Sequence, residues 1–209
     1  GIASSIRLAN QGYEVEVYEA NTYLGGKLTE KRLGAYRFDA GPSLFTMPDL
    51  VDELFRLSDL DAKAHFEYSS LEEICRYFYE DGTRLTAFSD KKKLIKEISS
   101  KLNTNENKLI KYLNKSKFKF ELTRKIFLES SLHKASTYFS IDAFKGIINF
   151  FKLDMTMSLN KLNSKNFNNK KLVQLFNRFA TYNGSNPYKT SGIMSMIQHL
   201  EHDLGVYMP

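Results

Sequence analysis

The first residues that could do chemistry are a glycine and an acid near the start of the chain. Gly1 opens an amphipathic segment, and Glu19 ends the alternating run EVEVYE eighteen residues later. A glycine at a helix N-terminus lets a pyrophosphate approach free N–H groups, and an acid after the next strand can bind ribose hydroxyls. The spacing matches the last glycine and the acid of a G-x-G-x-x-G dinucleotide site, without its first two glycines. The alternative is an amphipathic helix packed on an ordinary strand.

Two further glycine turns follow this pair. Gly25-Gly26-Lys27 combines backbone that a ligand can approach closely with a cation suited to a pyrophosphate. Gly41-Pro42 follows a short extended segment, and its bare backbone could lie against a flat ring. The alternatives are a surface turn with a solvated lysine and a plain turn. The first glycine turn strengthens the case for dinucleotide binding.

The segments that would position these residues alternate between helix and strand. Apolar spacing predicts a helix from Ile2 to Ala9, ended by Gly12, and then a strand over Glu14–Glu19. A helix at residue 1 followed at once by a strand is typical of the second half of a βαβ unit. We therefore expect a fragment that lacks the first strand and part of the glycine loop.

Later segments predict a small β-region and then helices. Residues 35–39 read as extended, a helix begins at Pro48-Asp49, and Asp81-Gly82 is a strong hairpin signal. The expected strands are 64–70, 73–80 and 83–89, and the expected helices are 91–102, 106–128, 141–157, 170–180 and 191–203. The fold class is therefore α/β, with a partial Rossmann-like domain over 1–90 and a mostly helical domain over 91–209.

The charge distribution changes at the same place. Residues 1–90 carry 9 basic and 16 acidic side chains, a net charge of −7, whereas residues 91–209 carry 21 and 8, a net charge of +13. Solvated helix faces are the plain interpretation. The more specific interpretation is attraction to an anionic surface. We favour a membrane over nucleic acid, because arginines are few and no known nucleic-acid-binding motif occurs.

Composition also bears on the compartment. No run of about 18 apolar residues occurs, so no spanning helix is expected, and the first residues do not resemble a signal peptide. Cys75 is the single cysteine and is expected to be a small buried hydrophobe. A cytoplasmic, reducing setting fits this pattern.

The four histidines give no strong metal signal. His199 and His202 have a spacing that could hold a metal, but with Glu201 and Asp203 alongside them we expect a solvated helix face and no metal site. His65 and His133 are expected to be structural.

Three blocks of the sequence carry a family resemblance. They are YEANTYLGGKLTEKRLGAYRFDAGPSLFTMPDLVDELFRLS, YEDGTRLTAFSD and LVQLFNRFATYNGSNPYKTSGIMSMIQHLEHDLGVYMP. Together they resemble the phytoene desaturase family of carotenoid desaturases, within the amine-oxidase-like flavoproteins. DAGPSLFTMP and YNGSNPYKT look closer to the branch that introduces the 3,4 double bond of hydroxylated carotenoids.

The resemblance implies FAD and assigns roles to the glycines. Gly1 would match the last glycine of the family's loop, and Glu19 the acid on the adenosine ribose. The residues Gly25, Gly26 and Lys27 would match the glycine-glycine-basic motif beside the phosphates, and Gly41 and Pro42 the turn near the isoalloxazine ring. The family's first strand, first two glycines and C-terminal half have no counterpart in the chain, so we expect the fragment alone to be inactive.

The resemblance also implies an apolar polyene substrate, such as phytoene or a carotenoid, and a monotopic position on the cytoplasmic side of a membrane. Loss of a hydride and a proton from adjacent carbons needs few polar side chains, and the sequence identifies no general base. Residues 141–155 place apolar side chains at helical spacing with Lys145 and Lys152 nearby, as in an interfacial helix. The alternative is the core of a helical domain.

Two other functions remain open. The first keeps the flavin and changes the substrate, as in an amine oxidase or a carotenoid saturase or isomerase. The second is a non-catalytic basic helical module that binds membrane or nucleic acid with steep salt dependence. That module gives no reason for the spacing of Glu19 and Gly25-Gly26. The oligomeric state is not indicated.

Overall fold

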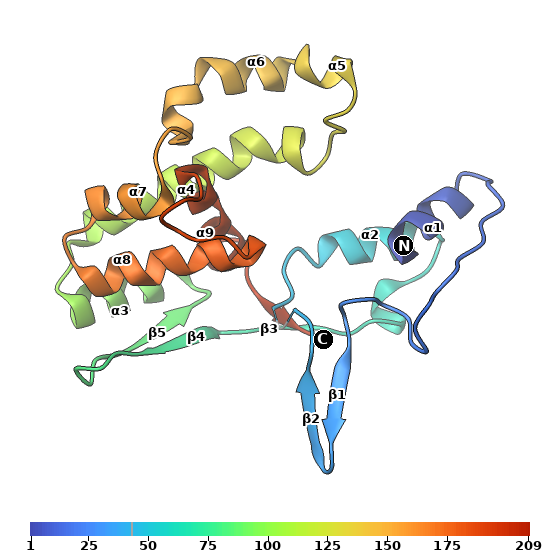
Figure 1. Ribbon diagram of the computed structural model, residues 1–209, viewed down its shortest axis with the longest axis horizontal. Coiled ribbons are helices and arrows are strands. Elements are labelled where there is room, and N and C mark those ends of the chain that lie inside the picture. The colour runs from blue at the N-terminus through green and yellow to red at the C-terminus, as the bar shows by residue number, and fades with distance from the viewer. Residues whose placement is uncertain (43) are drawn as a thin grey trace. The chain divides into compact units, whose positions relative to one another are not determined.

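The computed structural model describes residues 1–42 and 44–209 (Figure 1). The chain forms two compact units, Gly1–Leu71 with Gly205–Pro209, and Glu72–Leu204. The sequence predicts a boundary at Asp90, whereas the units divide at Leu71. The difference arises because the hairpin before Asp90 packs on the helix after it and shares its core.

In the first unit, helix α1 (Ile2–Ala9) lies against helix α2 (Asp49–Leu57), and both helices were expected. The Arg7 guanidinium lies 3.1 Å from the Glu53 carboxylate, and the Asn10 amide donates to the Ser58 hydroxyl at 2.9 Å. The strand predicted over Glu14–Glu19 is wrong: the segment has no regular structure, because no described strand pairs with it.

The rest of the first unit is built from two small ladders. Strands β1 (Glu30–Leu33) and β2 (Tyr36–Asp39) pair antiparallel, and β3 (Ser69–Ser70) pairs with β6 (Tyr207–Met208). The rings of Phe45, Phe66, Tyr68 and Tyr207 meet largely edge to face and form a small aromatic cluster. The extended segment expected at 35–39 is confirmed, and its partner β1 was not predicted.

The second unit begins with the hairpin that Asp81-Gly82 predicts. Strands β4 (Glu73–Phe78) and β5 (Arg84–Phe88) pair antiparallel, and Gly82 has φ +82°, which glycine adopts without strain. Cys75 was expected to be buried, but it is only half-buried against the core.

Helices make up the rest of the second unit. They are α3 (Lys91–Leu102), α4 (Glu106–Phe127), α5 (Ala135–Tyr138), α6 (Ile141–Ile148), α7 (Leu159–Asn166), α8 (Lys170–Asn177) and α9 (Gln198–His202), with 3₁₀ turns η2 (Phe150–Leu153), η3 (Arg178–Asn183) and η4 (Gly192–Ile197). The core contains Leu85, Leu94, Ile98, Leu109, Leu113, Leu172, Phe176 and Phe179. The predicted helices 91–102 and 106–128 are confirmed, whereas α7 was not predicted.

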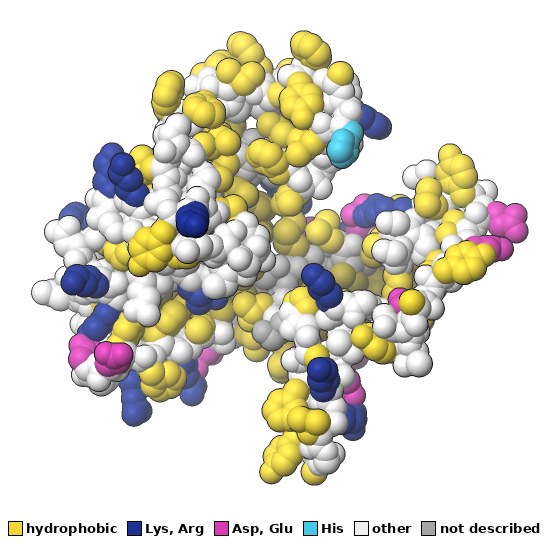
Figure 2. All heavy atoms as spheres, in the orientation of Figure 1, with side chains coloured by type: hydrophobic (Ala, Val, Ile, Leu, Met, Phe, Trp, Pro, Cys, Tyr) yellow, Lys and Arg dark blue, Asp and Glu magenta, His cyan; other side chains and the backbone are white. Residues whose placement is uncertain are grey.

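The helix predicted over 141–157 is shorter than expected. α6 ends at Ile148, and Asp154 has a left-handed φ of +55°, which ends the helical path. The side chains of its apolar face are exposed in the described part of the chain: Ile141, Phe144, Ile147, Ile148, Phe151 and Met155. Figure 2 shows apolar side chains gathered over α5 and α6. No helix in the described part of the chain has the length and apolarity to span a membrane.

The α/β class is therefore confirmed at the level of mixed helices and strands. The described strands form three antiparallel two-stranded ladders.

Candidate flavin site

The hairpin β1–β2 brings the two glycine turns together. Glu30 pairs with Asp39, and the Ala40 N–H donates to the Thr29 carbonyl at 2.9 Å, which extends the ladder toward both turns. A Cβ on Gly41 would lie 1.8 Å from the Lys27 carbonyl oxygen. Gly41 is therefore required because the backbone of the first turn lies against it.

The first turn leaves its own backbone accessible. Gly25 and Gly26 have φ of +108° and +61°, and the Leu28 N–H donates to the Gly25 carbonyl at 3.1 Å. A Cβ on Gly26 would meet no atom within 4 Å. The left-handed backbone explains both glycines, and the open space above Gly26 leaves room for a ligand near the main chain.

A cavity of about 790 Å³ lies beside these turns, within the usual range for small-molecule sites. Gly41 and Pro42 line it, and Leu24 and Leu28 flank the first turn at its wall. Aromatic and apolar side chains make up much of the lining: Tyr23, Leu44, Phe45, Val51, Phe66 and Met208. Such a cavity suits a flat ring system.

Charged side chains converge on one wall of the cavity. The Arg37 guanidinium pairs with Glu30 and lies 3.3 Å from the Asp39 carboxylate. The hydrogen bond from Arg37 is the main cause that lowers the pKa of Glu30. These three residues were not identified from the sequence, because their pairing depends on the register of a hairpin that the sequence did not predict.

Gly1 and Glu19 lie outside the cavity lining. Gly1 precedes α1 and is exposed, and a Cβ there would meet nothing within 4 Å. The Glu19 carboxylate accepts hydrogen bonds from the Asn21 N–H at 2.8 Å and the Asn21 side-chain amide at 2.9 Å. The backbone hydrogen bond is the main cause that lowers the Glu19 pKa, so the group remains an anionic acceptor at neutral pH.

The described residues fit FAD in part. The open backbone at Gly26 and the apolar cavity at Gly41-Pro42 fit the approach of a phosphate and a ring. The structure joins these two turns to each other, but it does not join them to Gly1 and Glu19.

The histidines in α9 differ from the expectation of a solvated face. His199, Glu201 and His202 are all buried, because α9 packs against α4. The His199 Nδ1 lies 2.7 Å from the Asp203 carboxylate, and the His202 Nδ1 lies 3.1 Å from the Phe88 carbonyl. Both rings therefore have structural partners. The other two histidines were expected to be structural. His65 stacks on the Phe55 ring, whereas the His133 side chain is exposed.

Two ion pairs in the second unit, each with one buried member, were not recognised from the sequence. The Arg178 guanidinium lies 2.5 Å from the Glu201 carboxylate, which also accepts from the Tyr182 hydroxyl at 2.5 Å. The Lys119 ammonium lies 2.6 Å from the Asp154 carboxylate. In a Lys-rich helix such as α4, the sequence alone does not distinguish a buried lysine from its exposed neighbours.

The glycine turns and the apolar cavity beside them offer accessible backbone and an apolar wall, which a flavin nucleotide would need. A family model described as flavin containing amine oxidoreductase matches residues 1–209. The chain belongs to this family, and the family implies FAD as its cofactor.

Several curated proteins of known name are similar to the chain. The chain is 49% identical over its full length to a 1-hydroxycarotenoid 3,4-desaturase of Flavobacterium sp. (strain P99-3), covering 42% of that protein. It is 25% identical over 99% of its length to a 4,4'-diapolycopen-4-al dehydrogenase of Metabacillus indicus and 28% identical over 99% to a 4,4'-diaponeurosporene oxygenase of Staphylococcus aureus (strain Mu50 / ATCC 700699), covering 41% of each. The chain spans about two fifths of the length of these relatives.

Proposed function

We propose that the protein containing this chain is an FAD-dependent carotenoid desaturase that introduces a double bond into a hydroxylated carotenoid. The observation that carries the proposal is the 49% identity to a 1-hydroxycarotenoid 3,4-desaturase along all 209 residues. The matched range covers both glycine turns and the helical unit.

In this proposal residues 1–90 contribute part of a Rossmann-like FAD domain. Gly1 and Glu19 bind the pyrophosphate and the adenosine ribose, and Gly25, Gly26 and Lys27 lie beside the phosphates. Gly41 and Pro42 form the wall against the isoalloxazine ring. The open backbone at Gly26 and the apolar cavity beside Pro42 support these roles.

The reaction removes a hydride and a proton from adjacent carbons of the polyene, so that a carbon–carbon double bond forms. Bound FAD supplies the hydride acceptor. The task of the protein's own residues is to hold an apolar chain and exclude water. The aromatic and aliphatic lining of the cavity, including Phe45 and Phe66, suits that task, and residues 91–209 would contribute to the substrate-facing part.

We further propose a monotopic position on the cytoplasmic face of a membrane. Phe139, Ile141 and Phe151 are 89%, 74% and 88% exposed. α6 presents an apolar surface, with Lys145 exposed near its end. An amphipathic helix of this kind binds at the boundary of headgroups and acyl chains, where a carotenoid substrate is dissolved.

The test uses the intact protein that contains this chain. After denaturation the supernatant should show released FAD, and the protein should convert a 1-hydroxycarotenoid into a product absorbing at longer wavelength. Glu19→Ala should weaken FAD binding, whereas the matched control Glu14→Ala should not. A protein that neither contains nor takes up FAD would contradict the proposal, and a flavoprotein that oxidises amines and leaves carotenoids unchanged would favour the amine oxidase alternative.

A further inference from the structure

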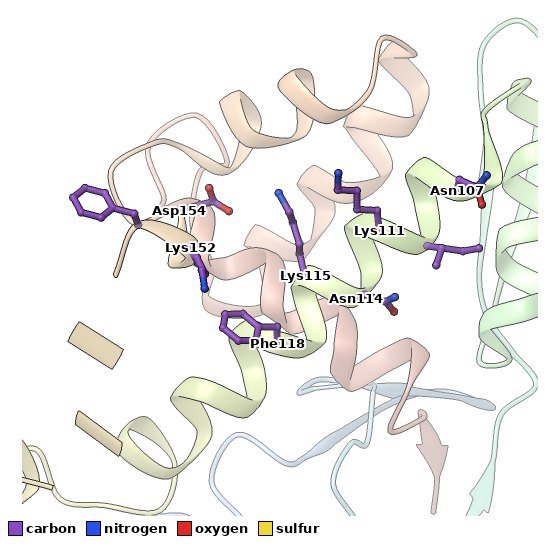
Figure 3. Close-up of a pocket in the computed structure, with 9 residues that line it drawn as sticks. Asn107, Lys111, Asn114, Lys115, Phe118, Lys152 and Asp154 are labelled. Atoms are coloured by element: carbon purple, nitrogen blue, oxygen red, sulfur yellow. The ribbon is translucent and has the colours of Figure 1, made fainter. Parts of the chain in front are cut away.

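A second cavity, of about 620 Å³, lies in the helical unit between α4 and the turn η2 (Figure 3). We call it the lysine groove. Its apolar wall consists of Ile110, Phe118 and Phe151, and its polar wall includes Lys111, Lys115, Lys152 and Asp154. It lies on the described helical unit alone and is separate from the cavity beside the glycine turns.

The charge of the lysine groove that is not compensated by an ion pair among the described residues is positive. The Asp154 carboxylate is paired with the buried Lys119 ammonium at 2.6 Å, so its negative charge is already compensated. Lys111 and Lys115 are exposed and have no ion-pair partner among residues 1–42 and 44–209. The Lys152 ammonium lies 5.8 Å from the Phe118 ring centre, which places a cation over the apolar wall. Three lysines without an ion-pair partner among the described residues therefore line a cavity that also has apolar side chains.

Phe151 connects the lysine groove to α6 along the chain. Phe151 lines the groove, is 88% exposed, and follows α6 by three residues. α6 itself packs against α4, the helix that supplies Lys111 and Lys115. Lysines beside exposed apolar side chains match the two layers of a membrane surface, because the chains enter the acyl region while the ammonium groups remain among the headgroups.

We propose that the lysine groove binds the phosphate headgroup of an anionic phospholipid in the bilayer on which α6 rests. This inference rests on the membrane position proposed above and adds the lipid class to it. The groove supplies cations for the phosphate and an apolar wall for the adjoining glycerol and acyl carbons. In a zwitterionic headgroup a cation already balances the phosphate, whereas an anionic headgroup has a net charge to offset the lysines, so binding should depend on lipid charge.

The experiment measures co-sedimentation of the intact protein with phosphatidylcholine vesicles, with and without phosphatidylglycerol. The variant combines Lys111→Gln, Lys115→Gln and Lys152→Gln. The matched control combines Lys92→Gln, Lys96→Gln and Lys101→Gln, three exposed lysines of α3, with the same change in net charge. Circular dichroism checks that both variants are folded, and glycerol phosphate serves as a soluble competitor.

We expect the groove variant to lose about a hundredfold in affinity for phosphatidylglycerol vesicles, at about fivefold per lysine, and the control much less. Binding to neutral vesicles should be unchanged in both. Equal losses in groove and control variants would overturn the proposal, as would equal binding of the unmodified protein to neutral and anionic vesicles. Binding of glycerol phosphate alone at the groove would assign it to a soluble phosphate. Absence of binding to any vesicle would overturn the membrane position as well, whereas FAD content tests the enzyme separately.

Discussion

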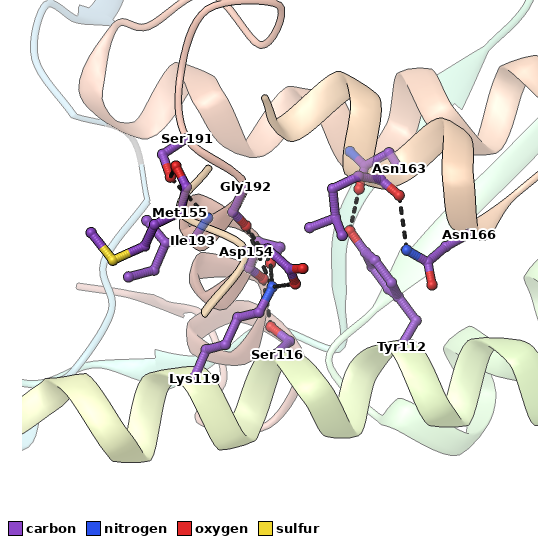
Figure 4. A network of polar contacts seen from close by, with 12 residues as sticks. Tyr112, Ser116, Lys119, Asp154, Met155, Asn163, Asn166, Ser191, Gly192 and Ile193 are labelled. Carbon is purple, nitrogen blue, oxygen red and sulfur yellow. Dashed lines mark hydrogen bonds and ion pairs between the residues drawn. The ribbon is translucent and has the colours of Figure 1, made fainter. Parts of the chain in front are cut away.

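The Lys119 ammonium lies 2.6 Å from the Asp154 carboxylate, although the Lys119 side chain is only 2% exposed (Figure 4). The ammonium also donates to the Ser195 hydroxyl at 2.8 Å. Burial lowers the Lys119 pKa, and the hydrogen bond and charge of Asp154 act against that shift. The pair joins α4 to the segments around η2 and η4, and it thereby holds one wall of the lysine groove in place.

Removal of the Asp154 charge should destabilise the helical unit. Asp154→Asn leaves Lys119 buried without its counter-charge, and we expect a loss of about 3–5 kcal/mol in the free energy of unfolding in urea. The control Lys117→Gln breaks an exposed pair with Glu121 and should cost less than about 1 kcal/mol. The double variant Lys119→Met, Asp154→Asn should be more stable than Asp154→Asn alone. An equally unstable double variant would show that the charge is not the cause.

Gly41→Ala should disrupt the contact between the two glycine turns. Its Cβ would lie 1.8 Å from the Lys27 carbonyl oxygen, so the backbone must move, and we expect FAD content to fall strongly in the intact protein. The control Gly146→Ala changes a glycine of α6. The added methyl group lies 3.7 Å from Ile126 Cδ1 of α4, an ordinary contact, so FAD content should not change. Normal FAD content in Gly41→Ala would exclude a role for this close approach.

The sequence predicted local structure better than it predicted tertiary contacts. The hairpin at Asp81-Gly82 and helix α3 were correct, because a turn dipeptide and a cap at Asp90 act over a few residues. The strand at Glu14–Glu19 was wrong, since a strand needs a hydrogen-bonded neighbour that the described chain does not supply.

The same limit applies to the candidate sites. The glycines at 25, 26 and 41 were singled out as turn residues, and the left-handed backbone of Gly25 and Gly26 explains their residue type, while their role toward a cofactor stays a prediction. The buried Lys119 and the inward-facing His202 were missed, because burial depends on which face of a helix packs, and short polar helices such as α9 show little periodicity.

Asp81 should titrate well below an ordinary aspartate. Hydrogen bonds from Lys171 and Thr83 lower its pKa to about 2. The folded pKa lies below the unfolded value, so the interaction is fully present above about pH 4. It is lost as the pH falls toward 2. An NMR titration of the carboxyl carbon in the intact protein should show this midpoint, and Lys171→Met should move it upward. A midpoint near 4 in the unmodified protein would contradict the pairing.

His202 should make the helical unit sensitive to mild acid. Burial is the main cause that lowers its pKa, and its Nε2 is buried without a hydrogen-bond partner among the described residues. The unfolded chain therefore binds more protons than the folded chain as the pH falls below about 6.5, and stability falls with it. Between pH 7.5 and 5.5 this effect should lower the free energy of unfolding. It should disappear in His202→Phe and persist in the control His133→Gln, whose ring is exposed. Urea unfolding at the two pH values measures the difference, and an unchanged pH dependence in His202→Phe would show that His202 is protonated equally in both states.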